Sequence, residues 1–456
     1  MAGISFELKK ILAEKKLTSL FKAFTYSAFL SSGSWVISIV SIILVSFVAS
    51  GLVKNKAVVA EFQVSITYLI ALSLIESGFF QYIYTRFVAD TIFKKKYNNI
   101  LPGFFLIILL NMLIGFIICI PLALYLFKNE PAIYTAIFIF SFVILCGLWI
   151  INALLTGLKN FNFILYSFIL GYLIIILLIL FLARFGLEGL MLAFFTGQSV
   201  IFILMTVLII NNFPSRKLIS FEFFKKGNAY LSLAFTGFFY NAGIWADKFV
   251  FWLSPYTSSQ VFGRLRDSVI YDVPIFLAYL SMVPGMAVFF IKIEGEFAEY
   301  YSIYYEAILR GDTFKKISSA GNAMIFSARD AFFDVLRIQA IADIIIFLID
   351  RSLFRLFGIS YIYLPLFHIL LLGTLLQLML FVLICFLFYF DRKKESLFIT
   401  FIFFLLNTVF SIISIYLGPY YYGYGYVYSL LISIVVSIIF LRRFLNEINY
   451  HTFMRF

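Results

Sequence analysis

The sequence predicts an all-α polytopic membrane protein with twelve transmembrane helices in two six-helix lobes. Of its 456 residues, 63% are hydrophobic and only 13% are charged, whereas about a quarter of the residues of an ordinary soluble domain are charged. Apolar stretches of about 20 residues, the length that crosses a bilayer, recur from end to end. Lys and Arg fall in short clusters between these stretches. The net charge of +12 therefore indicates membrane topology and not a nucleic-acid partner.

The chain opens with a basic segment, residues 1–22. Lysines interrupt it and no small-residue cleavage site follows, so it does not have the pattern of a cleavable signal peptide. Ile4, Leu8, Ile11 and Leu12 recur at helical spacing. We expect an amphipathic helix that lies on the cytoplasmic surface of the membrane.

Two sets of six spans follow, separated by a polar, basic linker at residues 211–228. The N-terminal lobe, residues 23–210, holds the spans 24–48, 61–88, 100–127, 132–157, 161–183 and 187–210. The C-terminal lobe, residues 229–441, holds the spans 229–253, 270–291, 337–357, 361–390, 396–417 and 426–441, and residues 442–456 form a tail. Similar Phe-Glu and Lys-Lys strings precede the first span of each lobe, which favours pseudo-symmetric halves. If the N-terminus is placed in the cytoplasm, the twelve spans put most Lys and Arg residues on the cytoplasmic side. Both termini are therefore predicted to be cytoplasmic.

One connection is much longer than the others, residues 292–337. Apolar residues recur in it at helical spacing on both sides of Gly311-Asp312, which predicts a cytoplasmic helical hairpin that extends the eighth and ninth spans. It either packs on the lobes or offers a docking surface for a cytoplasmic partner. The residues predicted for docking are Phe297, Tyr301, Tyr304, Ile308 and Arg310.

The sequence lacks the patterns of several enzymes. It has no Gly-Lys dipeptide, hence no P-loop, and no Asp-x-Asp pair of the kind that holds a metal in glycosyltransferases. Cys119, Cys146 and Cys385 lie in apolar runs without the spacing of a disulfide framework or zinc site. We predict no catalytic residue, no metal and no cofactor. His368 is the base of a membrane acyltransferase in one interpretation and a side chain bonded to a neighbouring helix in the other.

Ionisable residues inside spans are the candidates for function. A charge at the centre of the bilayer costs at least about 2.5 to 3.5 kcal/mol, so retained charges face a cavity or a partner. Glu76 and Arg86 lie on one predicted face of span 2 with Phe79, and Tyr82 lies close by. This stripe either lines a translocation path or forms an ion pair with another helix.

Span 7 is the densest of the spans in polar and aromatic residues. These residues either line the translocation path or stabilise the packing of the two lobes, and the sequence favours neither interpretation. It carries Tyr240, Asn241, Trp245, Asp247 and Lys248. Lys248 is near enough to the outer end for its amine to reach water, and Asp247 is expected to pair with a cation from another helix.

The predicted path also includes two acids in the C-terminal lobe. Asp272 starts span 8 beside Pro274, and Pro284-Gly285 interrupts that span later. Such broken helices occur where they line a cavity or are buried by neighbours. Asp343 in span 9 completes the set.

Specific strings add a family resemblance. They are Met1-Ala2-Gly3-Ile4-Ser5-Phe6-Glu7-Leu8, Ser31-Ser32-Gly33-Ser34-Trp35, Asn241-Ala242-Gly243-Ile244-Trp245-Ala246-Asp247-Lys248-Phe249, and Tyr271-Asp272-Val273-Pro274 through Pro284-Gly285-Met286-Ala287. In these strings, in length and in span count, the whole chain resembles the PelG family of Pel exopolysaccharide transporters. That family is a branch of the multidrug, oligosaccharidyl-lipid and polysaccharide exporter superfamily.

The resemblance implies a two-lobed exporter of the bacterial inner membrane that carries a polymer rich in N-acetylgalactosamine. It also implies partners: a cytoplasmic Pel glycosyltransferase that uses UDP-sugar, a cyclic-di-GMP receptor and a helical-repeat membrane subunit. The leading hypothesis is that polymer enters a cavity between the lobes and leaves along the predicted path. The alternatives are an ion-coupled antiporter for drugs or lipid-linked oligosaccharides, a membrane acyltransferase that uses His368, and a scaffold for a synthase.

Overall fold

The computed structural model describes residues 38, 41–53, 55–158, 160–224 and 230–453. The predicted segment 1–22, most of the first predicted span and the end of the predicted linker lie outside the described residues. Two compact units are present, one that ends at Ser268 and one that begins at Val269. We call them the N-unit and the C-unit. The predicted lobe boundary at residues 211–228 stays a prediction.

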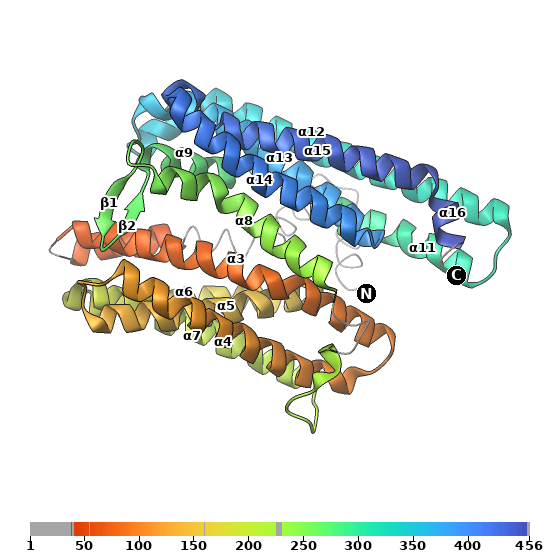
Figure 1. The fold of residues 1–456 in the computed structure, drawn as a ribbon, viewed down its shortest axis with the longest axis horizontal. Coiled ribbons are helices and arrows are strands. Elements are labelled where there is room, and N and C mark those ends of the chain that lie inside the picture. The colour runs from red at the N-terminus through yellow and green to blue at the C-terminus, as the bar shows by residue number, and fades with distance from the viewer. Residues whose placement is uncertain (1–37, 39–40, 54, 159, 225–229, 454–456) are drawn as a thin grey trace, which may run out of the picture. The chain divides into compact units, whose positions relative to one another are not determined.

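The N-unit is a bundle of long helices. These are α3 (Ala57–Phe93), α4 (Ile100–Leu126), α5 (Ala132–Gly157), α6 (Phe161–Leu182), α7 (Gly186–Asn212) and α8 (Leu231–Leu253), with the 3-10 turns η1 (Tyr97–Asn99), η2 (Ala183–Phe185) and η3 (Phe221–Phe224). They run side by side (Figure 1), with α3 packed on α5 and α8, α5 on α4 and α7, and α6 on α7. The chain turns from α6 into α7 at Gly186, whose φ of 68° suits glycine. Before these helices, Ser41–Leu52 forms a short apolar helix.

A short β-hairpin follows α8 and was not predicted. Its strands, β1 (Ser259–Phe262) and β2 (Leu265–Asp267), pair antiparallel with Ser259 opposite Asp267. Gly263, with a φ of 55°, forms the turn. Tyr68 on α3 donates its hydroxyl to the carbonyl oxygen of Arg266 at 3.0 Å, which fixes the hairpin to the bundle.

The C-unit contains a broken span and a long helical extension. Its elements are α9 (Val269–Leu280), α10 (Val283–Phe289), the π-helix η4 (Phe290–Phe297), α11 (Ala298–Leu309), α12 (Phe314–Leu356), η5 (Tyr361–Tyr363), α13 (Leu364–Tyr389), α14 (Lys393–Leu417), η6 (Pro419–Tyr421), α15 (Tyr424–Asn446) and α16 (Ile448–Phe453). α13 packs on α9, α12 and α15, and α14 packs on α15. The helix bends by 42° between α9 and α10, beside Pro284, which lacks the backbone N–H that a continuous helix needs.

The extension is a hairpin of α11 and the first part of α12. The chain reverses at Gly311, whose φ is 69°, and α11 packs along α12. Both continue past the ends of α13 and α14 (Figure 1). The side of the membrane on which this hairpin lies stays a prediction.

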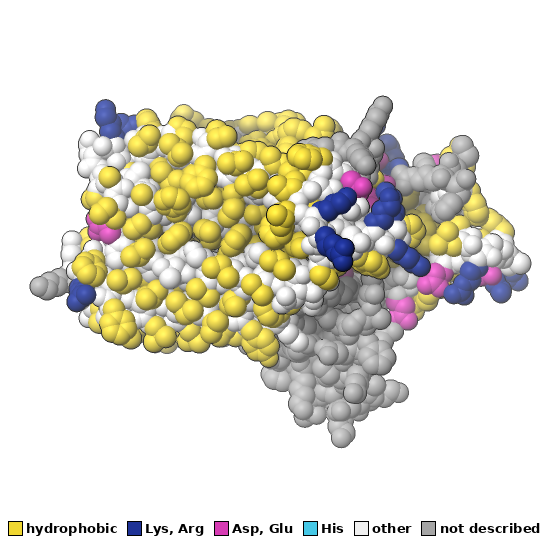
Figure 2. All heavy atoms as spheres, turned by 90° about the horizontal axis from the view of Figure 1, so that it is seen from below, with side chains coloured by type: hydrophobic (Ala, Val, Ile, Leu, Met, Phe, Trp, Pro, Cys, Tyr) yellow, Lys and Arg dark blue, Asp and Glu magenta, His cyan; other side chains and the backbone are white. Residues whose placement is uncertain are grey.

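The apolar helices identify a multi-pass membrane protein. Among the described residues, seven helical stretches are long and apolar enough to span a bilayer, or eight if the bent pair counts as one span. One of the seven covers both α6 and α7, and neither α8 nor α12 is included. Figure 2 shows hydrophobic side chains in a broad belt, with Lys and Arg beyond its ends. This is the pattern of a surface that faces lipid.

Candidate translocation site

The crossing of α3 and α8 sets the geometry of the N-unit site. A Cβ atom added at Gly237 would lie 2.1 Å from the carbonyl oxygen of Gly78, so only glycine allows the two backbones to approach this closely. Asn241, one turn further along α8, donates its amide to the carbonyl oxygen of Leu74 at 2.9 Å. Backbone contact and a side-chain hydrogen bond thus hold the two helices together.

Asp247 and Lys248 form an ion pair in the interior of the N-unit. The Lys248 amine lies 3.1 and 3.2 Å from the two carboxylate oxygens of Asp247 and donates to the carbonyl oxygen of Ile244 at 2.7 Å. Only 3% of Lys248 is exposed and none of Asp247, so the expectation that Lys248 reaches the water at the outer surface is wrong. Its amine also lies 5.9 Å from the centre of the Trp245 ring, and both charges have further interactions.

Glu76 is separated from the other polar residues predicted on its helix. Its carboxyl is buried against Asn111 of α4 and Cys146 of α5. Phe79, by contrast, contacts Phe235 of α8, with ring centroids 5.4 Å apart. The stripe predicted on span 2 is therefore divided, with Glu76 facing α4 and α5 and Phe79 facing α8.

Arg86 lies nearly three turns beyond Glu76 on α3 and is accessible. Its Nε pairs with Asp90 at 3.1 Å, and 37% of its side chain is exposed. Its guanidinium lies 5.8 Å from the centre of the Tyr230 ring. Tyr82 is half-buried, with its ring edge beside Gly237.

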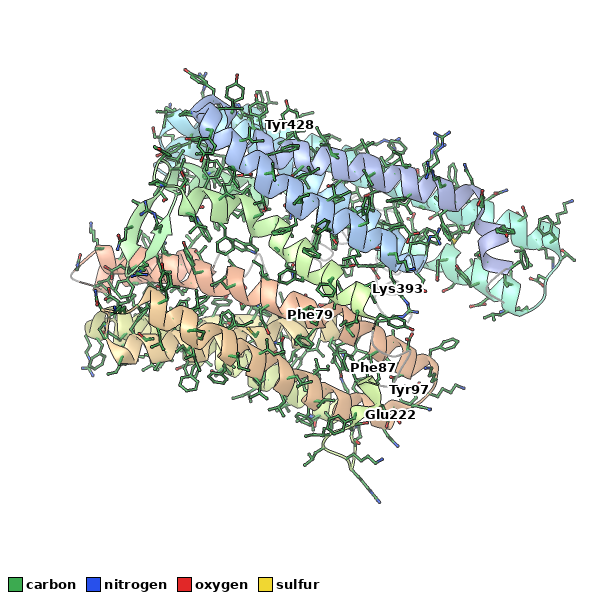
Figure 3. The ribbon with its side chains drawn as sticks, viewed as in Figure 1. Phe79, Phe87, Tyr97, Glu222, Lys393 and Tyr428 are labelled. Carbon is green, nitrogen blue, oxygen red and sulfur yellow. The ribbon has the colours of Figure 1, made fainter. Side chains whose placement is uncertain are left out.

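The same end of the N-unit holds Glu222 and Phe223, which belong to the predicted linker 211–228. The ring of Phe87 contacts that of Phe223, with centroids 5.6 Å apart, and Asn99 donates its amide to Glu222. Phe87, Tyr97 and Glu222 lie together at this end in Figure 3. The turn η3 is therefore packed on α3 and η1.

In the C-unit, polar side chains surround the break between α9 and α10. Gln339 of α12 donates to the carbonyl oxygen of Ser281 at 3.0 Å and to Asp343 at 2.8 Å. It passes so close to Gly285 that a Cβ there would lie 2.4 Å from its amide oxygen. Asp343 and Asp272 are half-exposed, and Asp272 has interaction partners. Asp343 thus belongs, with Gln339 and Ser281, to the group of hydrogen-bonded residues at the helix break.

His368 of α13 bonds to a neighbouring helix. Its Nε2 lies 2.6 Å from Asp350 of α12, and the ring of Phe347 packs against it with a centroid separation of 4.5 Å. Among the described residues no cluster of three His, Cys, Asp or Glu side chains has the arrangement to hold a metal ion.

The residues predicted for docking divide into buried and accessible ones. Phe297 and Tyr304 are fully buried; the former packs on Phe386 and the latter donates its hydroxyl to Thr452 at 3.4 Å. Tyr301 donates to the carbonyl oxygen of Tyr389 at 2.9 Å. Ile308 is half-buried and Arg310 exposed. The large apolar side chains exposed on this hairpin are others: Tyr300, Ile303, Leu309, Phe314, Phe326 and Phe333.

Sequence reasoning missed two polar residues that matter here. Asn111 lies in the long apolar run of α4 and Gln339 at the start of the predicted ninth span. A single amide within an apolar run is the signal that could have found both, since a buried amide requires a partner.

These helices have the fold of the multidrug, oligosaccharidyl-lipid and polysaccharide exporter superfamily. The chain is similar to an outward-facing multidrug resistance transporter of its MATE family, with a TM-score of 0.65, 14% identity, and 94% of this chain and 96% of that one covered. A second similar structure is a transporter of the superfamily from Pyrococcus furiosus, with a TM-score of 0.61, 15% identity, and coverage of 94% and 96%. An inward-facing MATE transporter matches with a TM-score of 0.55, 13% identity, and coverage of 92% and 99%. Among curated proteins, none is similar enough in sequence to count as a match.

The family follows from the sequence. The model of PelG, the exopolysaccharide exporter family (EPS-E), matches residues 1–453, so the chain belongs to that family. The resemblance seen in the individual strings is confirmed. Family and fold together indicate a membrane transporter rather than a catalytic enzyme.

Proposed function

We propose that this protein exports a Pel-type exopolysaccharide, rich in N-acetylgalactosamine, across the bacterial inner membrane. Membership of the exopolysaccharide exporter family over nearly the whole chain supports the substrate class. Polymer is made by a cytoplasmic glycosyltransferase and enters the exporter as it grows. The cyclic-di-GMP receptor and the helical-repeat subunit of the Pel system belong to the same assembly.

One structural observation supports the proposed translocation path. Arg86 and Asn241 in the N-unit and Asp272 in the C-unit are half-exposed, yet polar side chains in a membrane protein avoid lipid and face water or protein. In each unit, half-exposed polar residues in an otherwise apolar bundle therefore indicate a water-facing surface. Trp245, also half-exposed, adds a ring on which a sugar face can stack.

The buried members of the predicted set have a different role in this proposal. Asp247, Lys248 and Tyr240 are almost fully buried and hold α8 in place, so polymer does not contact them. Acids and amides along the path bind hydroxyl and acetamido groups weakly at many points, which allows a polymer to move.

The proposed topology has twelve spans in two six-helix lobes, with both termini in the cytoplasm. It places the α11–α12 hairpin on the cytoplasmic side, where the synthase docks. The exposed face of this hairpin, with Tyr300, Phe326 and Arg310, is the contact surface. Phe297 and Tyr304 are buried beneath this surface and stabilise the packing of the hairpin.

The test is reconstitution of the full chain with the glycosyltransferase outside lipid vesicles, supplied with labelled UDP-sugar. Polymer should accumulate inside the vesicles, protected from an added glycoside hydrolase. Normal synthesis with all product accessible to the hydrolase would contradict export. Vesicles that contain the glycosyltransferase alone are the control.

A second candidate is an ion-coupled antiporter for drugs or lipid-linked oligosaccharides, favoured by the fold shared with a multidrug resistance transporter. It predicts solute flux that needs an ion gradient and no synthase. The same vesicles without UDP-sugar, loaded with a fluorescent cation, distinguish the two.

A further inference from the structure

Glu76 lies where three helices of the N-unit meet. It projects from α3 toward Asn111 of α4 and Cys146 of α5. Only 9% of Glu76 is exposed and none of Asn111 or Cys146. The helices are tightly closed around it: the indole nitrogen of Trp149 on α5 donates to Ser73 of α3 at 2.9 Å.

Four buried polar atoms in this junction have no hydrogen-bond partner of normal geometry among the described residues. They are both carboxyl oxygens of Glu76 and both amide atoms of Asn111. Buried polar groups in proteins are almost always paired. Two facing side chains that both lack partners therefore indicate a site that binds something.

A proton is the smallest ligand that satisfies all four atoms at once. A protonated Glu76 donates its O–H to the amide oxygen of Asn111 and accepts the amide N–H on its other oxygen, forming a cyclic pair. An ionised Glu76 can accept that N–H, but it leaves the amide oxygen facing a carboxylate and a charge in an apolar junction. Cys146 is the titratable group among the described residues that acts on this carboxyl, and a thiol does not neutralise a carboxylate.

We propose that Glu76 and Asn111 form a proton-binding acid–amide pair that controls the packing of α3 against α4 and α5. When the proton is bound, the junction is dry and closed. When it leaves, the carboxylate needs water, so α3 must separate from its neighbours far enough to admit it. This site is distinct from the half-exposed path proposed for the polymer, and it gives the N-unit a packing change driven by one proton.

Infrared spectroscopy of the full-length protein in lipid vesicles tests the pair without polymer or synthase, so its outcome is independent of the proposed function. The wild type should show the C=O stretch of one protonated carboxyl at neutral pH and lose it on titration to alkaline pH. Glu76→Gln should lack this band, whereas the control Glu130→Gln, at a loop beyond α4, should keep it. A wild-type spectrum without the band, or a band that survives in Glu76→Gln, would overturn the proposal.

Two further variants keep the test decisive. Asn111→Leu removes the acid–amide bond, so the carboxyl band should move in frequency; an unchanged band would show that the two side chains do not pair.

Glu76→Gln should fold normally because a glutamine amide makes the same cyclic pair. Loss of the proton leaves a carboxylate in the closed junction, so the Tm of the wild type should fall on titration to alkaline pH. The Tm of Glu76→Gln should lack that fall, and an equal fall would count against the pair.

Discussion

The N-unit and the C-unit use polar side chains at helix contacts in different ways. In the N-unit, Asn241 bonds to α3 one turn from the contact of Gly78 with Gly237, and Asp247 pairs with Lys248 further along the intact helix α8. In the C-unit, Gln339 bonds to a carbonyl oxygen beside a helix break. Polar residues thus stabilise close helix packing in one unit and compensate for an interrupted helix in the other.

The largest expected effect comes from the ion pair of the N-unit. Asp247→Ala leaves the buried Lys248 amine without its carboxylate, and breaking a buried pair costs about 3–5 kcal/mol. We expect a large fall in Tm for the purified protein in detergent. The control Asp267→Ala, on the half-exposed strand β2, should change little. Equal Tm values for the wild type and Asp247→Ala would refute this account of the pair.

The helix crossing should be nearly as sensitive. Gly237→Ala places a methyl group against the backbone of Gly78, and overpacking of this kind costs about 1–3 kcal/mol. Thermal unfolding should therefore occur at lower temperature. Gly157→Ala, where nothing lies within 4 Å of the added atom, is the matched control. A crossing that tolerates alanine would show that close backbone contact is not required.

Substitution at the helix break of the C-unit should reduce stability less than substitution at the helix crossing of the N-unit. The break is stabilised by hydrogen bonds from one side chain, whereas the crossing depends on direct backbone contact. Gln339→Leu removes the bonds to Ser281 and Asp343, and we expect a loss near the lower end of the roughly 1–3 kcal/mol for unpaired buried groups. The exposed Gln63 on α3 provides the control, Gln63→Leu. A loss larger than that of Gly237→Ala would reverse the comparison between the units.

The smallest effect on stability should come from the hairpin surface. Phe326, 67% exposed, can change to Ser within about 0.5 kcal/mol, whereas Tyr304→Ser disturbs a buried ring. Polymer delivered per folded exporter should nevertheless fall in Phe326→Ser if the synthase docks there. Unchanged delivery would remove this face from the proposed interface.

The sequence was sufficient for the membrane class and the family, because apolar runs and specific strings are local features. It was less informative about which neighbour each side chain meets. Glu76 and Phe79 are three residues apart, yet one faces α4 and α5 and the other α8. Helical spacing gives a face but not the helix that covers it, so the buried state of Lys248 and the pairing of His368 with Asp350 also required the structure.

In our proposal, polymer passes the half-exposed polar residues and not the buried ones. Single cysteines at Asn241 and at the buried Ala246, in a background without Cys119, Cys146 and Cys385, can be labelled with a membrane-impermeant maleimide while polymer is stalled in the exporter. We predict that the cysteine at position 241 reacts in the empty protein and is protected by polymer, whereas that at position 246 does not react in either state. Labelling at 246 that polymer blocks, with none at 241, would contradict the proposal.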